Sequence, residues 1–135
     1  MAIRISATTS RNIEKVWQVW TSPEDIKCWN AASDDWHTTH AEVDLRVGGK
    51  FLSRMEAKDG SFDFDFEGEY TNIVKPKLIE YSLGDGRKVR IEFLPLENAT
   101  KIVETFDPEE QNPLEMQEKG WQAILDNFVK HVESR

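Results

Sequence analysis

The sequence predicts an α+β fold in which a curved antiparallel sheet of about seven strands packs against one long C-terminal helix. Much of the chain between residues 39 and 107 alternates apolar and polar side chains in short runs separated by turn signals, which is typical of antiparallel strands. Residues 114–132 instead repeat apolar side chains at helical spacing, over a helix about 30 Å long. Each element has one apolar face to bury, so the helix and the sheet are expected to cover each other.

The N-terminal part is predicted to form one strand and two short helices. Residues 3–8 alternate apolar and polar side chains and indicate a strand, whereas residues 11–20 place apolar side chains at helical spacing. A second helix begins within the stretch TSPED, where Ser22 is the expected N-cap and Pro23 takes the first helical position. This short helix is expected to carry Trp29 inward.

Six further strands are predicted to follow in hairpin order. Two tight turns, Asp59–Gly60 and Asp85–Gly86, separate neighbouring strands of this series. Short connections suffice throughout, which favours antiparallel pairing. The strands are expected at residues 39–46, 50–57, 61–73, 76–83, 88–94 and 100–107.

The last helix is predicted to start with Asn112 as its N-cap and Pro113 in its first turn, with Glu115 completing a capping box. Gly120 interrupts this helix, at a cost of about 1 kcal/mol relative to Ala in a helix interior. We expect the glycine either to permit close approach of the sheet or to leave room beside Trp121.

The stretch SFDFDFEGEY, residues 61–70, alternates aromatic rings with acids. Because a strand sends successive side chains to opposite faces, this pattern predicts an aromatic wall backed by a solvated acidic face. The wall borders either a packed aromatic core or a cavity. A steeply curved sheet with a single helix across it leaves a gap, which favours the cavity. The rings on one parity are Phe62, Phe64, Phe66 and Tyr70.

Length, charge and cysteine content limit the possible functions. The 135 residues fit one domain, residues 1–135. A net charge of −8 argues against a nucleic-acid or anionic-membrane partner, both of which require clustered positive charge. We expect no membrane span, because no apolar run approaches about 18 residues. The single cysteine, Cys28, and the lack of a secretory signal suit a cytoplasmic protein.

Five sequence motifs, spread over nearly the whole chain, are similar to those of a known superfamily: VWQVWTSPEDIKCWN, DLRVGGKF, FEGEYTNI, VETFDPE and GWQAILDNFVKHVE. In these motifs and in its order of elements, the chain resembles the SRPBCC (START/Bet v 1-like) superfamily. Within it, the chain is similar to the branch named after the activator of the ninety-kilodalton heat-shock protein's ATPase. The resemblance implies a helix-grip fold, with an elongated cavity between sheet and helix that commonly holds an apolar small molecule.

Glu104 is the first candidate for a functional side chain. On the strand at residues 100–107 it shares its parity with Ile102 and Phe106, so an interior Ile/Phe face would bring the carboxyl inward. The alternative is that Val103 points inward and Glu104 lies on the solvent face. An inward carboxyl among apolar groups either finds a donor or titrates high, and such groups serve as general acids or ligand anchors.

The other predicted cavity residues are mostly aromatic. Arg87 is expected to reach the cavity mouth or to pair with Glu104, unless it is an exposed turn arginine. His37, with Trp36, is expected either to form part of a polar cap over the cavity or to lie on the surface. His37 and His40 stand three apart, but a loop entering a strand does not close a metal site, so no metal or other cofactor is expected. With Glu104, the predicted ligand-binding residues are Trp29, Trp36, His37, Phe51, Met55, Phe64, Phe66, Arg87, Phe93, Phe106, Gln117 and Trp121.

The leading functional hypothesis is the binding of a small hydrophobic or aromatic molecule in this cavity. The first alternative is an enzyme resembling the polyketide cyclases and aromatases of the same fold, with Glu104 as its acid or base. The second is a chaperone-partner module. It is the least favoured, because the eukaryotic activator also uses a separate N-terminal domain that nothing in these 135 residues resembles.

Overall fold

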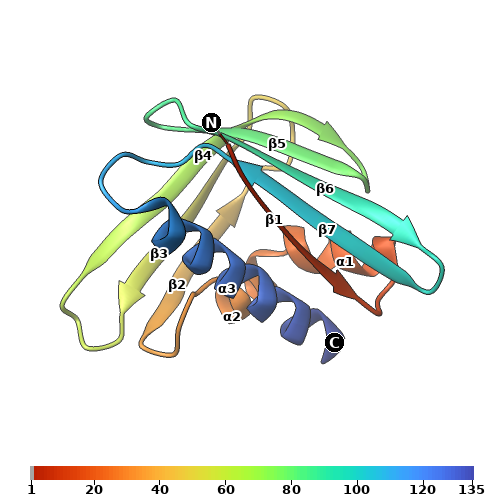
Figure 1. Ribbon diagram of the computed structural model, residues 1–135, viewed down its shortest axis with the longest axis horizontal. Coiled ribbons are helices and arrows are strands. Elements are labelled where there is room, and N and C mark those ends of the chain that lie inside the picture. Colours follow the sequence, from red (N-terminus) through yellow and green to blue (C-terminus); the bar gives the residue numbers. More distant parts are fainter. Residues whose placement is uncertain (1) are drawn as a thin grey trace.

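The computed structural model describes residues 2–135 and confirms the predicted fold class. All seven strands form one antiparallel sheet in the order β1-β7-β6-β5-β4-β3-β2. The sheet curls, and the long C-terminal helix lies across its concave side (Figure 1). The elements are β1 (Ile3–Thr9), α1 (Ile13–Thr21), α2 (Pro23–Trp29), β2 (Trp36–Val43), β3 (Lys50–Ala57), β4 (Asp63–Val74), β5 (Leu78–Leu83), β6 (Lys88–Leu96), β7 (Ala99–Phe106) and α3 (Leu114–Glu133).

The C-terminal half of α3 is sealed into the core. Leu125, Phe128 and Val132 are fully buried, and the helix packs on β1. The ring of Phe128 meets the rings of Trp20 and Trp29 edge-on, with centroids 4.7 and 5.0 Å apart. The two short helices therefore pack against the C-terminal half of α3 at one end of the sheet.

Polar contacts hold the end of α3 to the N-terminal elements. The buried carboxylate of Asp25 on α2 lies 2.8 Å from Nε2 of His131 and 3.4 Å from Nε of Arg135. The Arg11 side chain donates to the carbonyls of Val132 and Glu133, which the helix end leaves without intrahelical donors. These contacts fix where α3 runs, and so which part of it faces the sheet.

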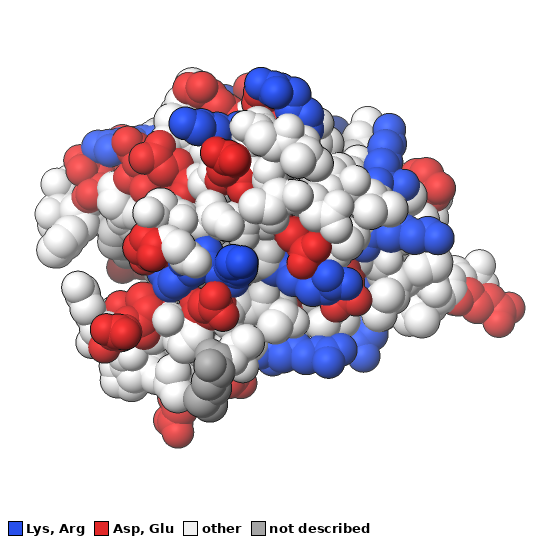
Figure 2. All heavy atoms as spheres, turned by 90° about the horizontal axis from the view of Figure 1, so that it is seen from above, with Lys and Arg blue, Asp and Glu red and all other residues white. Residues whose placement is uncertain are grey.

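The outer face of the sheet is charged, as the alternation of residues 61–70 predicts. Arg54 on β3 forms ion pairs with Asp63 and Asp65 on β4, both at 3.0 Å. Arg90 on β6 similarly pairs with Glu80 on β5 at 3.0 Å. Acidic and basic side chains lie interspersed on the surface seen from above (Figure 2). No helix within residues 2–135 is long and apolar enough to cross a membrane.

The aromatic wall is only partly interior, which corrects the sequence-based expectation. Phe66 is half-buried and Tyr70 is buried, but Phe62 is 71% exposed and Phe64 48% exposed. The reason is the length of the β3–β4 hairpin, whose tip projects at the lower left of Figure 1, beyond the reach of α3. Alternation predicts toward which side of the sheet a strand residue points, but it does not predict how far along the strands α3 covers that side.

Several element boundaries differ from the predicted ones. Strand β2 begins at Trp36, three residues earlier than expected, and ends at Val43, because the chain turns through Asp44–Gly49. Gly48 adopts a φ of +84°, which favours glycine, and its N–H donates to the Tyr70 carbonyl at 2.8 Å. This turn therefore docks on β4 instead of extending β2.

Helix α1 also differs from its predicted range. It begins at Ile13, and its N-cap is Asn12, whose side chain accepts from the Lys15 N–H at 2.9 Å. At α2 the expectation is confirmed, since Ser22 is the N-cap and Pro23 follows it.

The predicted capping box of the last helix is wrong. Pro113 occupies the N-cap position, with no side-chain cap hydrogen bond. The loop before the helix is held instead by Gln117, whose Nε2 donates to the carbonyls of Glu109 and Asn112 at 3.0 and 2.8 Å. Its Oε1 accepts from the Glu109 N–H at 2.8 Å. Asn112 takes part through its backbone and not as a cap.

Gly120 leaves open space, because a Cβ built on it would meet no atom within 4 Å. Gly120→Ala is therefore expected to raise the free energy of unfolding by about 1 kcal/mol through helix propensity alone. Urea denaturation of both proteins measures this difference. A destabilised variant would show that this face of the helix needs the glycine.

Candidate functional site

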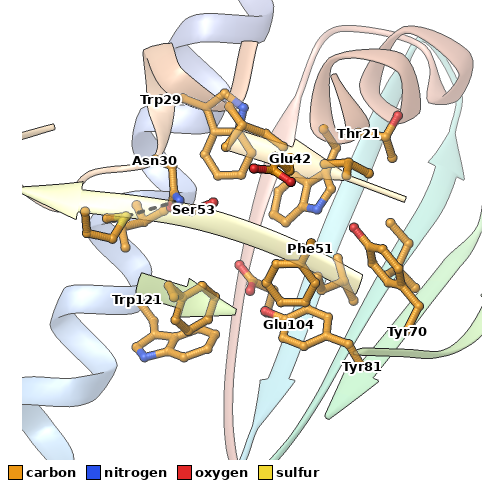
Figure 3. A pocket seen from close by; sticks show the side chains of 18 of the residues that line it. Thr21, Trp29, Asn30, Glu42, Phe51, Ser53, Tyr70, Tyr81, Glu104 and Trp121 are labelled. Carbon is orange, nitrogen blue, oxygen red and sulfur yellow. Dashed lines mark hydrogen bonds between the residues drawn. The ribbon is translucent and has the colours of Figure 1, made fainter. Parts of the chain in front are cut away.

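A cavity of about 320 Å³ lies between the concave face of the sheet and the three helices. Its wall is mostly apolar, and every element except β1 contributes to it. Two of its lining residues, Phe64 and Glu42, are exposed to solvent. The aromatic lining residues, several of them labelled in Figure 3, are Trp20, Trp29, Phe51, Phe64, Phe66, Tyr70, Tyr81 and Trp121.

Phe51 is the centre of the aromatic wall. Its ring centroid lies 4.6 Å from that of Tyr81, 5.4 Å from that of Tyr70 and 5.8 Å from that of Phe66. This placement requires Gly68, the cross-strand partner of Phe51, because a Cβ at Gly68 would come within 2.8 Å of the Phe51 ring. The glycine in the word FEGEY thus makes room for the ring that organises the wall.

Glu104 lies on the inward face and lines the cavity. Its cross-strand neighbours are Ile5 on β1 and Ile91 on β6, both buried, and such neighbours share a face of the sheet. Only 5% of Glu104 is exposed. Val103 is buried as well, although alternation places it on the opposite face, so burial alone does not separate the two sequence-based alternatives. The cavity does, because Glu104 borders it and Val103 does not.

The Glu104 carboxyl has no hydrogen bond or ion pair with any of residues 2–135 that the structure describes. Burial therefore acts without compensation and raises the pKa of this carboxyl from 4.5 to about 8. Burial, and then the charge of Glu104, also raises the pKa of Tyr81 well above its usual value. At neutral pH most Glu104 side chains in the empty protein are accordingly protonated and uncharged.

Among the lining residues that the structure describes, one side chain is basic, that of Arg87, and it pairs with Asp85. Nε of Arg87 lies 2.8 Å from Oδ2 of Asp85 in the same turn, and about a quarter of its side chain is exposed. Arg87 thus reaches the cavity wall, but its ion pair is with Asp85 and not with Glu104. At the rim, the mostly exposed Glu42 lies 2.6 Å from Nε2 of His40.

On the α2 side, polar groups fix the wall. Met55 is buried, and its sulfur accepts from Thr38 Oγ1 at 3.1 Å. It also accepts from Asn30 Nδ2 at 3.5 Å, a contact drawn as a dashed line in Figure 3. Thr38 also donates to the Asn30 carbonyl at 2.7 Å. Because these bonds tie the end of α2 to β2 and β3, this wall is held in place by more than apolar packing.

Eight of the thirteen predicted ligand-binding residues line the cavity. The structure brings together Trp29, Phe51, Met55, Phe64, Phe66, Arg87, Glu104 and Trp121. The other five lie outside it: Trp36, His37, Phe93, Phe106 and Gln117.

Two of those five belong to the packed core. Phe93 is fully buried, between the rings of Trp17 and Trp20. Phe106 stacks behind Trp121, with centroids 3.9 Å apart and planes within 9°. They support the wall from behind but do not face the cavity.

The remaining three have structural or surface positions. Gln117 holds the loop before α3, as described above. Trp36 and His37 belong to β2 and line a separate, polar surface groove, so they do not cap the cavity as expected. Trp36 touches the cavity only indirectly, through an edge contact with Phe64 at 5.9 Å. Within residues 2–135, no group of three or more His, Cys, Asp or Glu side chains could hold a metal ion.

Sequence reasoning missed several cavity residues. Ser53 shares its parity with Phe51 and Met55, so alternation alone predicts its direction. Tyr81 is recognisable in the same way from its buried neighbours on β5. The helical residues and Glu42 carry no comparable signal, because their place depends on how α1, α2 and β2 meet the sheet. The missed residues are Trp20, Thr21, Ile26, Asn30, Glu42, Val43, Ser53, Ile79, Tyr81, Ile91 and Ile124, whereas Tyr70, which also lines the cavity, belongs to the predicted aromatic wall.

Comparison with protein families identifies the chain. The family described as "Activator of Hsp90 ATPase homolog 1-like protein" matches residues 10–133. The chain belongs to this family. The predicted resemblance to the heat-shock-protein ATPase activator branch of the SRPBCC superfamily is thereby confirmed. Among curated proteins, none matches this sequence.

Solved structures agree with the family assignment. The solution structure of the AHSA1-like protein from Aeromonas hydrophila is 46% identical, with a TM-score of 0.93 over 99% of this chain and 93% of that one. A solution structure from Cytophaga hutchinsonii is 50% identical, with a TM-score of 0.85 over 98% and 92% of the two chains. A crystal structure from Nitrosomonas europaea, 20% identical over 99% and 95% of the chains, shares the fold with a TM-score of 0.86.

Proposed function

We propose that the protein binds a small molecule with an apolar or aromatic body in the cavity between the sheet and α3. The observation that carries this proposal is an unfilled space of about 320 Å³ bounded by eight aromatic residues, with one unpaired carboxyl in its wall. Ligand pockets span about 300–1,000 Å³, so the space suits a compact molecule. If no ligand bound here, side chains that filled the space would make the folded protein more stable, because atoms that line a void lose van der Waals contacts.

Proton-transfer catalysis on the bound molecule is a second candidate function, which one observation favours. The pKa of Glu104 is raised to about 8, near the value at which a carboxyl works as a general acid at neutral pH. Binding requires the cavity alone, whereas catalysis also requires a reactive substrate in it. We therefore place binding first.

Titration with a panel of compact aromatic and aliphatic compounds, followed by amide chemical shifts, tests the binding proposal. We expect shifts at wall residues such as Phe51, Phe66 and Tyr81, and none at the exposed apolar residues Val47 and Val74. Binding should weaken in Ser53→Leu, because Ser53 is buried and borders the cavity, so that a larger side chain fills part of it.

Ser61→Leu is the matched control, since Ser61 is exposed and lies outside the cavity lining. Its affinities should equal those of the wild type. A panel that moves no wall residue, or equal weakening by both substitutions, would contradict the proposed site.

A further inference from the structure

We propose that the preferred occupant of the cavity is an organic cation, a protonated amine on an aromatic or aliphatic body. This inference rests on the proposed function and specifies the ligand class. It follows from three features of the wall: a buried carboxyl without a partner, the absence of a free basic group among the described lining residues, and the surrounding rings.

The first feature is the unpaired carboxyl. Glu104 is 95% buried, stands between Ile5 and Ile91, and borders the empty space. A buried carboxyl without a donor is costly, and a donor supplied by the ligand removes that cost. An ammonium group does so most strongly, because a charge-assisted hydrogen bond is roughly twice as strong as a neutral one. Figure 3 shows Glu104 within the group of lining side chains, close behind Phe51.

The second feature is the sign of the charges that face the cavity. Besides Glu104 on β7, a second carboxylate, that of Glu42 on β2, lies at the rim. The single lining cation in the described chain, Arg87 in the β5–β6 turn, is neutralised by Asp85 at 2.8 Å. An anionic ligand would find no free cation among the described lining residues. A cation would find the unpaired carboxyl of Glu104 and, at the rim, the carboxylate of Glu42, which also lies 2.6 Å from His40.

The third feature is the aromatic content of the wall. On the helical side of the cavity, the ring centroids of Trp20 and Trp29 are 4.8 Å apart. On the sheet side, the ring centroids of Phe51 and Tyr81 are 4.6 Å apart. Ring faces attract cations, and most strongly where the cation is desolvated. A neutral molecule gains burial from these rings but not this added term, so the rings and Glu104 favour the same ligand class.

The pH dependence of binding separates a cation from a neutral acceptor. Glu104 is largely protonated in the empty protein at pH 6, so binding of an ammonium group must release a proton. The other titratable or charged groups that face the cavity are Tyr81 and Tyr70, both with a raised pKa, together with Arg87 and Glu42. Helix α3 contributes no charged side chain to the lining. Affinity for an amine should therefore rise from pH 6 to pH 8.

The test compares three probes of one shape: 2-naphthylmethylamine, 2-naphthylmethanol and 2-naphthoic acid, titrated by calorimetry at pH 6, 7 and 8. The amine is expected to bind at least about tenfold more tightly than the alcohol at pH 8, and the acid most weakly. In Glu104→Gln the advantage of the amine over the alcohol should fall to about threefold or less, and its rise with pH should disappear. Glu67→Gln, which changes an exposed carboxylate outside the cavity lining, should keep both effects.

Two results overturn this inference while leaving the proposed function in place. One is tighter binding of the alcohol or the acid than of the amine by the wild-type protein. The other is an advantage of the amine that Glu104→Gln leaves unchanged, with the variant shown to be folded by its thermal transition. Failure of all three probes to bind would contradict the proposed function itself, and the cation preference with it.

Discussion

Replacing Glu104 by Gln is expected to stabilise the protein relative to the wild type as the pH rises. The difference in the free energy of unfolding should widen by about 3 kcal/mol between pH 4 and pH 7. Gln has nearly the shape of Glu, keeps a polar end at the cavity and does not titrate. The prediction concerns the change of the difference with pH, so any constant cost of burying the amide cancels.

The direction follows from where the proton is held. The pKa of Glu104 is about 8 in the folded protein, against an ordinary value of 4.5. Between these values the folded state keeps a proton that the unfolded state has lost, so unfolding releases it. The stabilising contribution of the protonated carboxyl is therefore complete below pH 4.5 and is lost as the pH rises through 8. Groups that titrate identically in both proteins, among them Asp25 with its lowered pKa, cancel in the comparison.

Urea denaturation of wild type and Glu104→Gln from pH 4 to pH 9 measures the effect. Glu42→Gln is the matched control, because it makes the same substitution at a mostly exposed carboxylate. Its free energy of unfolding should differ from that of the wild type by an amount that changes little with pH. Parallel stability curves for wild type and Glu104→Gln would mean that water or another group solvates Glu104 in the folded protein. The ligand preference inferred above would then lose its main support.

The second large effect is expected at Phe93. Its ring is completely buried, with the rings of Trp17 and Trp20 at 5.7 and 5.6 Å. Phe93→Ala removes these contacts and leaves a closed void, so the free energy of unfolding should fall by about 3–5 kcal/mol. Phe66→Ala should cost only about 1–2 kcal/mol, because that ring is half-buried and one side of it already faces the cavity.

Chemical denaturation of both variants at one pH gives the comparison, and Phe93→Leu provides a milder change if Phe93→Ala does not fold. For ligand affinity we expect the larger effect at Phe66. Phe66→Ala should change the affinity, because the ring borders the cavity, and Phe93→Leu should leave it close to the wild-type value. Equal stability costs at the two positions would indicate that the Phe66 side of the molecule is packed as tightly as the Phe93 side. That result would contradict the presence of a cavity beside Phe66.

Phe93 and Phe66 also bear on the two alternatives for the aromatic side chains, a packed core or a cavity. The protein contains both. Where α1 and α2 meet α3, the rings of Trp20, Trp29, Phe93 and Phe128 contact one another, and Phe93 and Phe128 are fully buried. Trp20 and Trp29 also border the cavity, and the rings of Phe51 and Phe66 border it from the sheet.

The local features of this structure follow from the amino-acid sequence. The strand Lys50–Ala57 has both ends where alternation and turn residues place them. The helical stripe of α3 supplies the residues that are buried in it, and the parity of Glu104 with Ile102 and Phe106 correctly predicts its inward direction. These features depend on the period of a strand or helix, which a few neighbouring residues set.

Which of the inward side chains border the cavity depends instead on how the sheet and the helices pack together. Glu104, Phe106 and Phe93 all point inward, yet only Glu104 borders the space. Gln117 lies on the buried stripe of α3 but is bonded to the preceding loop, and Phe62 has the parity of the wall but lies beyond the helix. Each outcome depends on the curvature of the sheet and the course of α3. Packing between segments distant in sequence sets both, so periodicity along the chain does not reveal them.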